Sequence, residues 1–258
     1  MDLDIAGLRV LVTAGAAGIG LEIARTFIRE GARVHVCDVD RTALQALAGT
    51  DPRLSASYGD VADRTDVARI FDEALAALGG LDVLVNNAGI AGPTGRVEEI
   101  NPEDWDRCLD VCITGQFNCT RLAVPHLRRS RNASIVNLSS AAGRFGFPLR
   151  TPYAAAKWAV IGFTKSLSRE LGADGIRVNA ILPGVVAGDR QRRVLEAKAQ
   201  QLGVTYQEME RAALANASLK EYVTAQQIAD QIVFLCSPRG RTISGQAIAI
   251  DGDLQMLA

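Results

Sequence analysis

Short apolar runs alternate with segments of helical periodicity along the whole chain. The runs have the length of strands buried on both faces, and the segments between them repeat apolar residues at the spacing of an amphipathic helix. This alternation predicts right-handed crossovers and an α/β fold built on a mainly parallel sheet. Seven strands are expected, centred on Val10, Val34, Ala56, Leu84, Val136, Val178 and Ile248.

A clear helical pattern runs from Tyr153 to Leu171 and carries two polar residues of complementary chemistry. Tyr153 and Lys157 are four residues apart, so they are expected on one helix face and within reach of each other. Ser140 follows the apolar run 134–138. Its hydroxyl is therefore expected at the carboxyl end of a strand, where open α/β sheets bind ligands.

A tyrosine beside a lysine can act as a proton donor and acceptor. A free phenol stays protonated at neutral pH, but an ammonium about 4 Å away stabilises the phenolate by roughly 4 kcal/mol at an effective dielectric constant of about 20. The pair is then a candidate acid or base. Taken alone, it also fits an ordinary surface contact on an alanine-rich helix, so the prediction depends on the other motifs.

A glycine-rich turn joins the first predicted strand to the first predicted helix. Residues 13–20 read Thr-Ala-Gly-Ala-Ala-Gly-Ile-Gly. The glycines let the backbone approach a pyrophosphate, and the helix start offers unpaired N–H groups and a partial positive charge. A simple tight turn is the alternative, which the strand context and a spaced acidic residue disfavour. Dinucleotide contacts are expected from Gly15, Ala17, Gly18, Ile19 and Gly20.

The spaced acidic residue is Asp38, which ends the second predicted strand eighteen residues after Gly20. A carboxylate here accepts hydrogen bonds from the adenosine ribose hydroxyls and repels the 2′-phosphate of NADP. The loop also has Ala17 where a basic residue would neutralise that phosphate. The sequence therefore favours NAD as the cofactor.

With these motifs the chain resembles the short-chain dehydrogenase/reductase family over nearly its whole length. Further pieces match in family order, namely Asp60-Val61, Asn86-Asn87-Ala88-Gly89, Ser140, Asn179 and Pro183-Gly184. The resemblance implies a Rossmann-like, doubly wound sheet with strand order three, two, one, four, five, six, seven. It also implies a homotetramer, with the helices around 104–127 and 153–171 and the tail 251–258 at subunit contacts.

The resemblance further implies a role for each matching residue. Tyr153 is implied as the acid or base and Ser140 as the group that orients the substrate oxygen. Lys157 is implied to bind the nicotinamide ribose as well as to stabilise the phenolate. Cofactor contacts are implied for Asp60, Val61, Asn87, Ala88, Gly89, Tyr153, Lys157, Pro183, Gly184 and Val186.

Three positions depart from the family pattern. Ala14 replaces the first glycine of the loop, although Gly15 follows it directly. Cys112 stands where the family usually has an asparagine, so an altered proton relay is expected. Ala187 replaces a threonine often found near the nicotinamide carboxamide.

Length and composition fit one Rossmann-type domain over residues 1–258. No run approaches the roughly twenty uncharged residues of a membrane helix, and the start of the chain lacks a basic signal-peptide region, so a cytoplasmic protein without a membrane partner is expected. The net charge of −1, with scattered basic residues, gives no electrostatic footprint for nucleic acid.

The five cysteines lack the short paired spacings of a zinc site or a redox dithiol, so no metal site and reduced core thiols are predicted. Cys108 and Cys112 are one helical turn apart, which leaves a metal or a regulatory thiol as a less favoured alternative. His35 and His126 are interpreted as structural.

A substrate lid is expected at 185–222, with helices at 191–201 and 206–217. Arginines at the start of this segment and in the loop before Tyr153 favour an anionic or polyhydroxylated substrate, although solvated surface arginines are the alternative. Arg150 and Arg190 are the candidate substrate contacts. The other arginines of this group are Arg144, Arg192 and Arg193.

The leading hypothesis is NAD-dependent hydride transfer between a small-molecule secondary alcohol and nicotinamide C4, with a sugar, sugar acid or related polar molecule as substrate. A 3-oxoacyl thioester reductase is one alternative, which Asp38 disfavours because that activity usually employs NADPH. A catalytically impaired NAD-binding regulatory protein is another, suggested by Cys112 and opposed by the retained Ser140, Tyr153 and Lys157.

Overall fold

Seven parallel strands form one sheet in the computed structural model, which describes residues 2–257. The order is β3-β2-β1-β4-β5-β6-β7, as the family resemblance implies. The strands are β1 Arg9–Thr13, β2 Arg33–Asp38, β3 Leu54–Tyr58, β4 Val83–Asn86, β5 Ser134–Leu138, β6 Arg177–Pro183 and β7 Ala247–Ile250. All seven predicted strand centres are confirmed. From β1 the connections lead outward through β2 to β3 at one edge, and from β4 they lead through β5 and β6 to β7 at the other edge. The order of the strands therefore reverses between β1 and β4, and such a switch point opens a crevice at the carboxyl ends of the strands.

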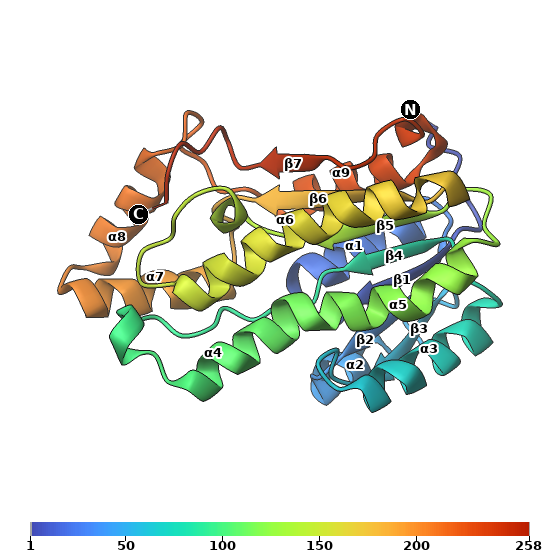
Figure 1. The fold of residues 1–258 in the computed structure, drawn as a ribbon, viewed down its shortest axis with the longest axis horizontal. Helices are drawn as coiled ribbons and strands as arrows, with labels where there is room; N and C mark the ends of the chain where they lie inside the picture. Colours follow the sequence, from blue (N-terminus) through green and yellow to red (C-terminus); the bar gives the residue numbers. More distant parts are fainter. Residues whose placement is uncertain (1, 258) are drawn as a thin grey trace.

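Helices cover both faces of the sheet and extend beyond its carboxyl edge (Figure 1). The α-helices are α1 Gly18–Arg29, α2 Arg41–Leu47, α3 Arg64–Leu78, α4 Pro102–Leu109, α5 Gly115–Leu127, α6 Thr151–Leu171, α7 Asp189–Leu202, α8 Tyr206–Ala215 and α9 Ala225–Cys236. The arrows of β4, β6 and β7 point towards the side that carries α7 and α8 (Figure 1). Within residues 2–257, no helix is both long enough and apolar enough to span a bilayer.

Two apolar clusters, one on each face, hold the sheet between the helices. One joins the inner faces of α1 and α9 to the strands, and the other joins α3, α5 and α6 to the opposite face. Strands β4 and β5 are buried at every position. Their nearly continuous apolar sequence is what burial on both faces of a parallel sheet requires.

The segment expected to be helical around 104–127 is interrupted in the middle. Helix α4 ends at Leu109, a π-helical turn spans Asp110–Thr114, and α5 begins at Gly115. The widened turn inserts one extra residue into the hydrogen-bond ladder, and Cys112 lies within it. Helix α6 begins at Thr151, two residues before the predicted start, with Pro152 in its first turn. A proline is favoured there because its missing N–H has no partner inside the helix.

Candidate active site

A cavity of about 720 Å³ lies at the carboxyl ends of the central strands. Its wall is formed by the glycine turn after β1, the ends of β4 and β5, the first turns of α6, and the chain between β6 and α7. This volume is within the usual range of small-molecule sites.

The glycine turn is held against the end of β4 by hydrogen bonds. The Asn87 side-chain amide donates to the Thr13 and Ala14 carbonyl oxygens at 2.9 and 3.0 Å. The Thr13 hydroxyl accepts from the Asn87 and Ala88 N–H groups at 3.0 and 2.9 Å. Ala14 adopts a left-handed backbone, with φ of 50°. A glycine carries no penalty in that conformation, so Ala14 is a strained replacement for the expected glycine.

Two glycines of the turn serve different purposes. A Cβ at Gly20 would collide with the Ala14 carbonyl oxygen and lie 2.5 Å from the Asn87 side-chain nitrogen, so the absence of a side chain lets α1 pack on the turn. Gly18 has a φ of 54°, and no atom lies within 4 Å of the position of its missing Cβ. Space is therefore open beside the first residue of α1. The residue before it, Ala17, provides no side-chain cap to the helix N–H groups.

Asp38 faces this open space from the end of β2. One carboxylate oxygen accepts from the Ala16 N–H at 3.0 Å, and the other accepts from the Asp40 N–H at 3.1 Å. These bonds fix the carboxylate against the glycine turn while each oxygen keeps further acceptor capacity. Asp38 and Asp40 both line the cavity.

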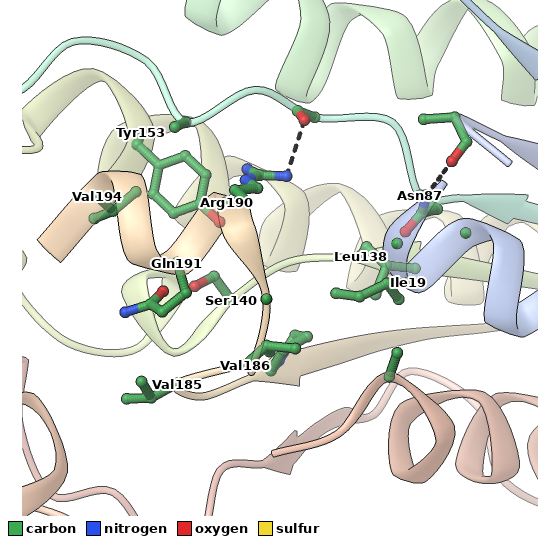
Figure 2. Close-up of a pocket in the computed structure, with 18 of the residues that line it drawn as sticks. Ile19, Asn87, Leu138, Ser140, Tyr153, Val185, Val186, Arg190, Gln191 and Val194 are labelled. Carbon is green, nitrogen blue, oxygen red and sulfur yellow. Dashed lines mark hydrogen bonds between the residues drawn. The ribbon is translucent and has the colours of Figure 1, made fainter. Parts of the chain in front are cut away.

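Tyr153, Lys157 and Ser140 lie together at the opposite end of the cavity. Tyr153 and Lys157 share one face of α6, with the ammonium nitrogen 5.5 Å from the centre of the tyrosine ring. The buried ammonium donates to the Leu138 carbonyl oxygen at 2.8 Å. Figure 2 draws Tyr153 and Ser140 in the wall of this cavity, together with Arg190 and Gln191 from α7. The predicted one-turn pairing on a single helix is confirmed.

Ser139 and Ser140 are held in place because the segment 139–143, which follows β5, packs closely against α6. The Ser139 hydroxyl donates to the Lys157 carbonyl oxygen at 2.7 Å, while the Ser140 hydroxyl oxygen accepts from the Ala142 N–H at 3.1 Å. A Cβ at Gly143 would lie 2.6 Å from the Lys157 carbonyl oxygen. Glycine at this position therefore permits the contact that places Ser140 beside α6.

Cys112 lies buried behind Tyr153 and Lys157. Its thiol is 3.5 Å from the Ile90 carbonyl oxygen. A hydrogen bond from the Cys108 thiol lowers the pKa of Cys112, and the Lys157 charge acts in the same direction against the effect of burial. The pKa of Cys108 is raised correspondingly, because it is the donor of the pair. All five cysteines are buried free thiols.

Most of the predicted site residues meet in the cavity. Those that line it are Ala17, Gly18, Ile19, Gly20, Asp38, Asn87, Gly89, Ser140, Arg150, Tyr153, Lys157, Pro183, Gly184, Val186 and Arg190. Four predicted cofactor contacts are absent from the wall formed by the described residues, namely Gly15, Asp60, Val61 and Ala88. Asp60 instead pairs with Arg107 at 2.6 Å, and Val61 packs in the core beside Gly115. Contacts of these four with a cofactor stay predictions.

The predicted arginine group divides in two. Arg150, Arg190 and Arg193 line the cavity. Arg192 faces away and pairs with Glu196 at 2.9 Å. Arg144 was expected near the substrate, but its guanidinium pairs with Asp251 at 3.2 Å and donates to the Leu254 carbonyl oxygen. The carboxyl-terminal tail thus binds this side chain in the structure, and a contact of Arg144 with substrate stays a prediction.

The tail and the lid complete the wall. The Gln255 N–H donates to the Asn216 carbonyl oxygen at 2.9 Å, and Leu257 reaches the cavity. Helix α7 begins two residues before the predicted lid helix, and α8 ends two residues earlier than predicted. Sequence reasoning also missed Phe147, Gln191, Val194 and Leu257 as lining residues. Gln191 and Val194 fall inside the predicted lid, whereas no local pattern signals that residue 257 folds back.

Comparisons with known proteins define the class to which this fold and cavity belong. A family model described as enoyl-(acyl carrier protein) reductase matches residues 14–254. A 3-oxoacyl-(acyl-carrier-protein) reductase of Thermotoga maritima is 35% identical over 256 residues, or 98% of this chain and 99% of that protein. A probable galactose dehydrogenase of Rhizobium meliloti is 36% identical over 254 residues, or 96% and 95%.

A solved structure supports the same assignment. The crystal structure of levodione reductase matches with a TM-score of 0.90 at 26% identity, covering 96% of this chain and 97% of that one. The chain belongs to the short-chain dehydrogenase/reductase family, as its motifs predict. It is an oxidoreductase of that type, acting on small molecules.

Proposed function

We propose that this protein transfers hydride between NAD and a small, polar secondary alcohol or the corresponding ketone. The observation that carries the proposal is the meeting of Tyr153, Lys157 and Ser140 with the glycine turn in one cavity. A dinucleotide-binding module alone has no need for a phenol beside a buried ammonium. The cofactor, when bound, supplies or accepts the hydride at nicotinamide C4.

The glycine turn fits a dinucleotide. The open space beside Gly18 and the uncapped start of α1 offer N–H groups to a pyrophosphate. Asp38 offers carboxylate oxygens to the adenosine ribose from the same end of the cavity. The backbone at Pro183, Gly184 and Val186 lines the other end and is the proposed support of the nicotinamide.

The side chains around the reacting oxygen have separate proposed roles. Tyr153 takes the proton of the substrate hydroxyl during oxidation and returns it during reduction. Lys157, held by the Leu138 carbonyl oxygen, stabilises the phenolate that forms and binds the nicotinamide ribose. The Ser140 hydroxyl orients the substrate oxygen. Cys112 replaces the asparagine of the usual proton relay, so the relay is altered, but Tyr153, Lys157 and Ser140 are all retained.

The Asp38 carboxylate predicts a preference for NAD that mutation can reverse in part. Asp38→Ser is expected to weaken NAD binding by roughly 10-fold, the effect of losing one charge-assisted hydrogen bond, while NADP binding improves because the repulsion is gone. Quenching of protein fluorescence gives the dissociation constants of NAD and NADP, and their ratio measures the preference. Asp72→Ser, an exposed change on α3, is the matched control. If Asp38→Ser has the same ratio of NAD to NADP dissociation constants as the wild type, the proposed role of Asp38 in cofactor preference is contradicted.

A 3-oxoacyl thioester reductase remains the second candidate, because relatives of that name match over nearly the whole chain. The similarity to a probable galactose dehydrogenase favours a polar alcohol equally well. A panel that contains sugars, sugar acids, polyols and an acetoacetyl thioester, each assayed with NAD or NADH, separates them. Turnover of polar alcohols supports the proposal, and exclusive turnover of the thioester supports the alternative.

We also propose a homotetramer in the cytoplasm. Phe117 on α5 and Trp158 on α6 are 43% and 53% exposed, and large apolar side chains on neighbouring helices favour a subunit contact.

A further inference from the structure

Arg150 is buried at the start of α6 although its guanidinium carries a full charge. Only 1% of the residue is exposed. One terminal nitrogen, Nη2, donates to the Ala91 carbonyl oxygen, whereas Nε and Nη1 have no hydrogen-bond partner among residues 2–257. Burial lowers the pKa of this side chain, because the charged form is poorly solvated. A buried charge with unused donors is costly unless a partner of opposite charge reaches it.

The surroundings of Arg150 add positive charge. Its guanidinium and that of Arg190 lie 5.4 and 6.0 Å from the centre of the Tyr153 ring. Lys198, on the same lid helix as Arg190, lies 4.5 Å from the Phe147 ring that Arg150 also faces. Burial, together with the charge of Arg150, lowers the pKa of Lys198 to about 8. The like charges of Arg190 and Lys198 therefore act against the burial of the Arg150 charge.

A side cavity of about 380 Å³ opens where these groups meet the main cavity. It is lined by Arg150, Arg190 and Arg193, and none of its lining residues in the described part of the chain is acidic. Figure 2 shows Arg190 reaching from α7 to the Gly89 carbonyl oxygen, a bond of 3.0 Å. The main cavity has its acidic residues at the cofactor end, with Asp38 and Asp40, and at Asp189 beside the lid.

A purely structural role accounts for little of this arrangement. Anchoring the Ala91 carbonyl oxygen requires one N–H group of Arg150, and a neutral donor would do so without a buried charge. The residue before Arg150, Leu149, adopts a left-handed φ of 64°, which is unfavourable for a branched side chain. Among residues 2–257, the chain thus holds a charge with two unused donor atoms in the cavity wall beside Tyr153 instead of out in solvent.

We propose that Arg150, assisted by Arg190 from the lid, binds an oxyanionic group of the substrate beside the carbon that is oxidised. This inference rests on the proposed function and names its substrate class, a small hydroxy acid or another compact alcohol with a carboxylate, sulfonate or phosphate. The anion satisfies Nε or Nη1 of Arg150, and because both atoms are buried, this requires the guanidinium to turn into the cavity that it lines. Both guanidiniums lie close to the Tyr153 ring. The anionic group and the oxygen that exchanges its proton with Tyr153 must therefore be only a few bonds apart, which requires a small substrate.

Matched pairs of acids and neutral analogues test the subsite. The pairs are 3-hydroxybutyrate with 3-hydroxybutyramide, lactate with lactamide, gluconate with glucose, and glycerol 3-phosphate with glycerol; 2-hydroxypropanesulfonate is compared with 2-propanol. In the wild type, the best acid is expected to exceed its neutral partner in kcat/KM by roughly 10- to 100-fold, the range of charge-assisted hydrogen bonds. The best acid identifies the oxyanion as carboxylate, sulfonate or phosphate.

Variants then assign the preference to Arg150. Arg150→Met is expected to bring the ratio of kcat/KM for acid over neutral partner close to one, whatever its effect on the rate with the neutral partner, and Arg150→Lys to restore part of the ratio. Arg192→Met, on the same lid helix but paired with Glu196 at the surface, is the control and keeps the wild-type ratio. The ratio of kcat/KM for the acid to kcat/KM for its neutral partner reports substrate recognition alone, because a general loss of structure lowers both values together.

A second measurement needs neither turnover nor a stable variant. NADH fluorescence reports the affinity of the wild-type NADH complex for malonate and for malonamide, and malonate is expected to bind at least roughly 10-fold more tightly. Equal turnover of acids and neutral partners, or equal affinity for malonate and malonamide, overturns the subsite and leaves the proposed dehydrogenase intact. Failure of the protein to bind NADH at all overturns the proposed function instead.

Discussion

Tyr153→Phe is expected to lower kcat by roughly 10²- to 10⁴-fold, the usual contribution of a positioned acid or base. The phenyl ring keeps the volume and the contacts of the tyrosine on α6, so the fold and the cavity are retained. Only the hydroxyl that exchanges the proton with the substrate is lost. The dissociation constant for NADH should therefore stay within about twofold of the wild-type value, because the affinity of the cofactor does not depend on proton transfer.

Steady-state rates and NADH binding together test this expectation. Tyr206→Phe is a suitable control, because that hydroxyl contacts Glu210 at 3.0 Å on the outer part of the lid. Full activity in Tyr153→Phe would contradict the proposed mechanism. Equal losses in the two variants would also contradict it, because Tyr206 is not among the residues that line the cavity.

Lys157→Met is expected to lower kcat by roughly 10²- to 10³-fold, comparable to the loss of one preorganised electrostatic contact in an active site. The change removes the ammonium near the Tyr153 ring and one donor to the Leu138 carbonyl oxygen, which also accepts from the Gln116 side-chain amide at 3.2 Å. Unlike Tyr153→Phe, it should also weaken NADH binding, because the ammonium is the proposed partner of the nicotinamide ribose. The two variants thus have different signatures, which kcat and the NADH dissociation constant distinguish.

Lys165 provides the matched control for this variant. It lies two turns further along α6 and donates to the Gly245 carbonyl oxygen at 3.3 Å, far in the sequence from the glycine turn. Lys165→Met should leave both kcat and NADH binding close to wild type. A Lys157→Met protein with normal NADH affinity and normal turnover would remove the lysine from the mechanism.

Regular periodicity explains why the fold was predictable from the sequence. Strands buried on both faces leave continuous apolar runs such as 83–86 and 134–138, and amphipathic helices leave a repeating stripe. The strand order was not contained in these patterns and came from the family motifs. The i to i+4 relation of Tyr153 and Lys157 was predictable as well, because helical geometry alone fixes it.

Long-range contacts explain what the sequence did not reveal. Arg144 and Asp251 are separated by 107 residues, and their pairing depends on how the tail folds back. The π-helical turn around Cys112 packs against α6 and has no periodic signature in the sequence. Arg150 was a candidate substrate contact from its place in the sequence. Its burial and its unused nitrogens became visible only when the side chain and the lid were placed together.

The central claim is hydride transfer between nicotinamide and a carbon of a small polar substrate, and an isotope label tests it most directly. Purified protein is incubated with NADH that carries deuterium at both C4 positions and with a panel of oxo acids, ketoses and neutral ketones, and the products are analysed by mass spectrometry. We expect at least one alcohol product to carry a single deuterium on its carbinol carbon, and Tyr153→Phe to abolish this product. Binding of NADH without deuterium in any product across the panel would contradict the claim and favour a nucleotide-binding regulatory protein.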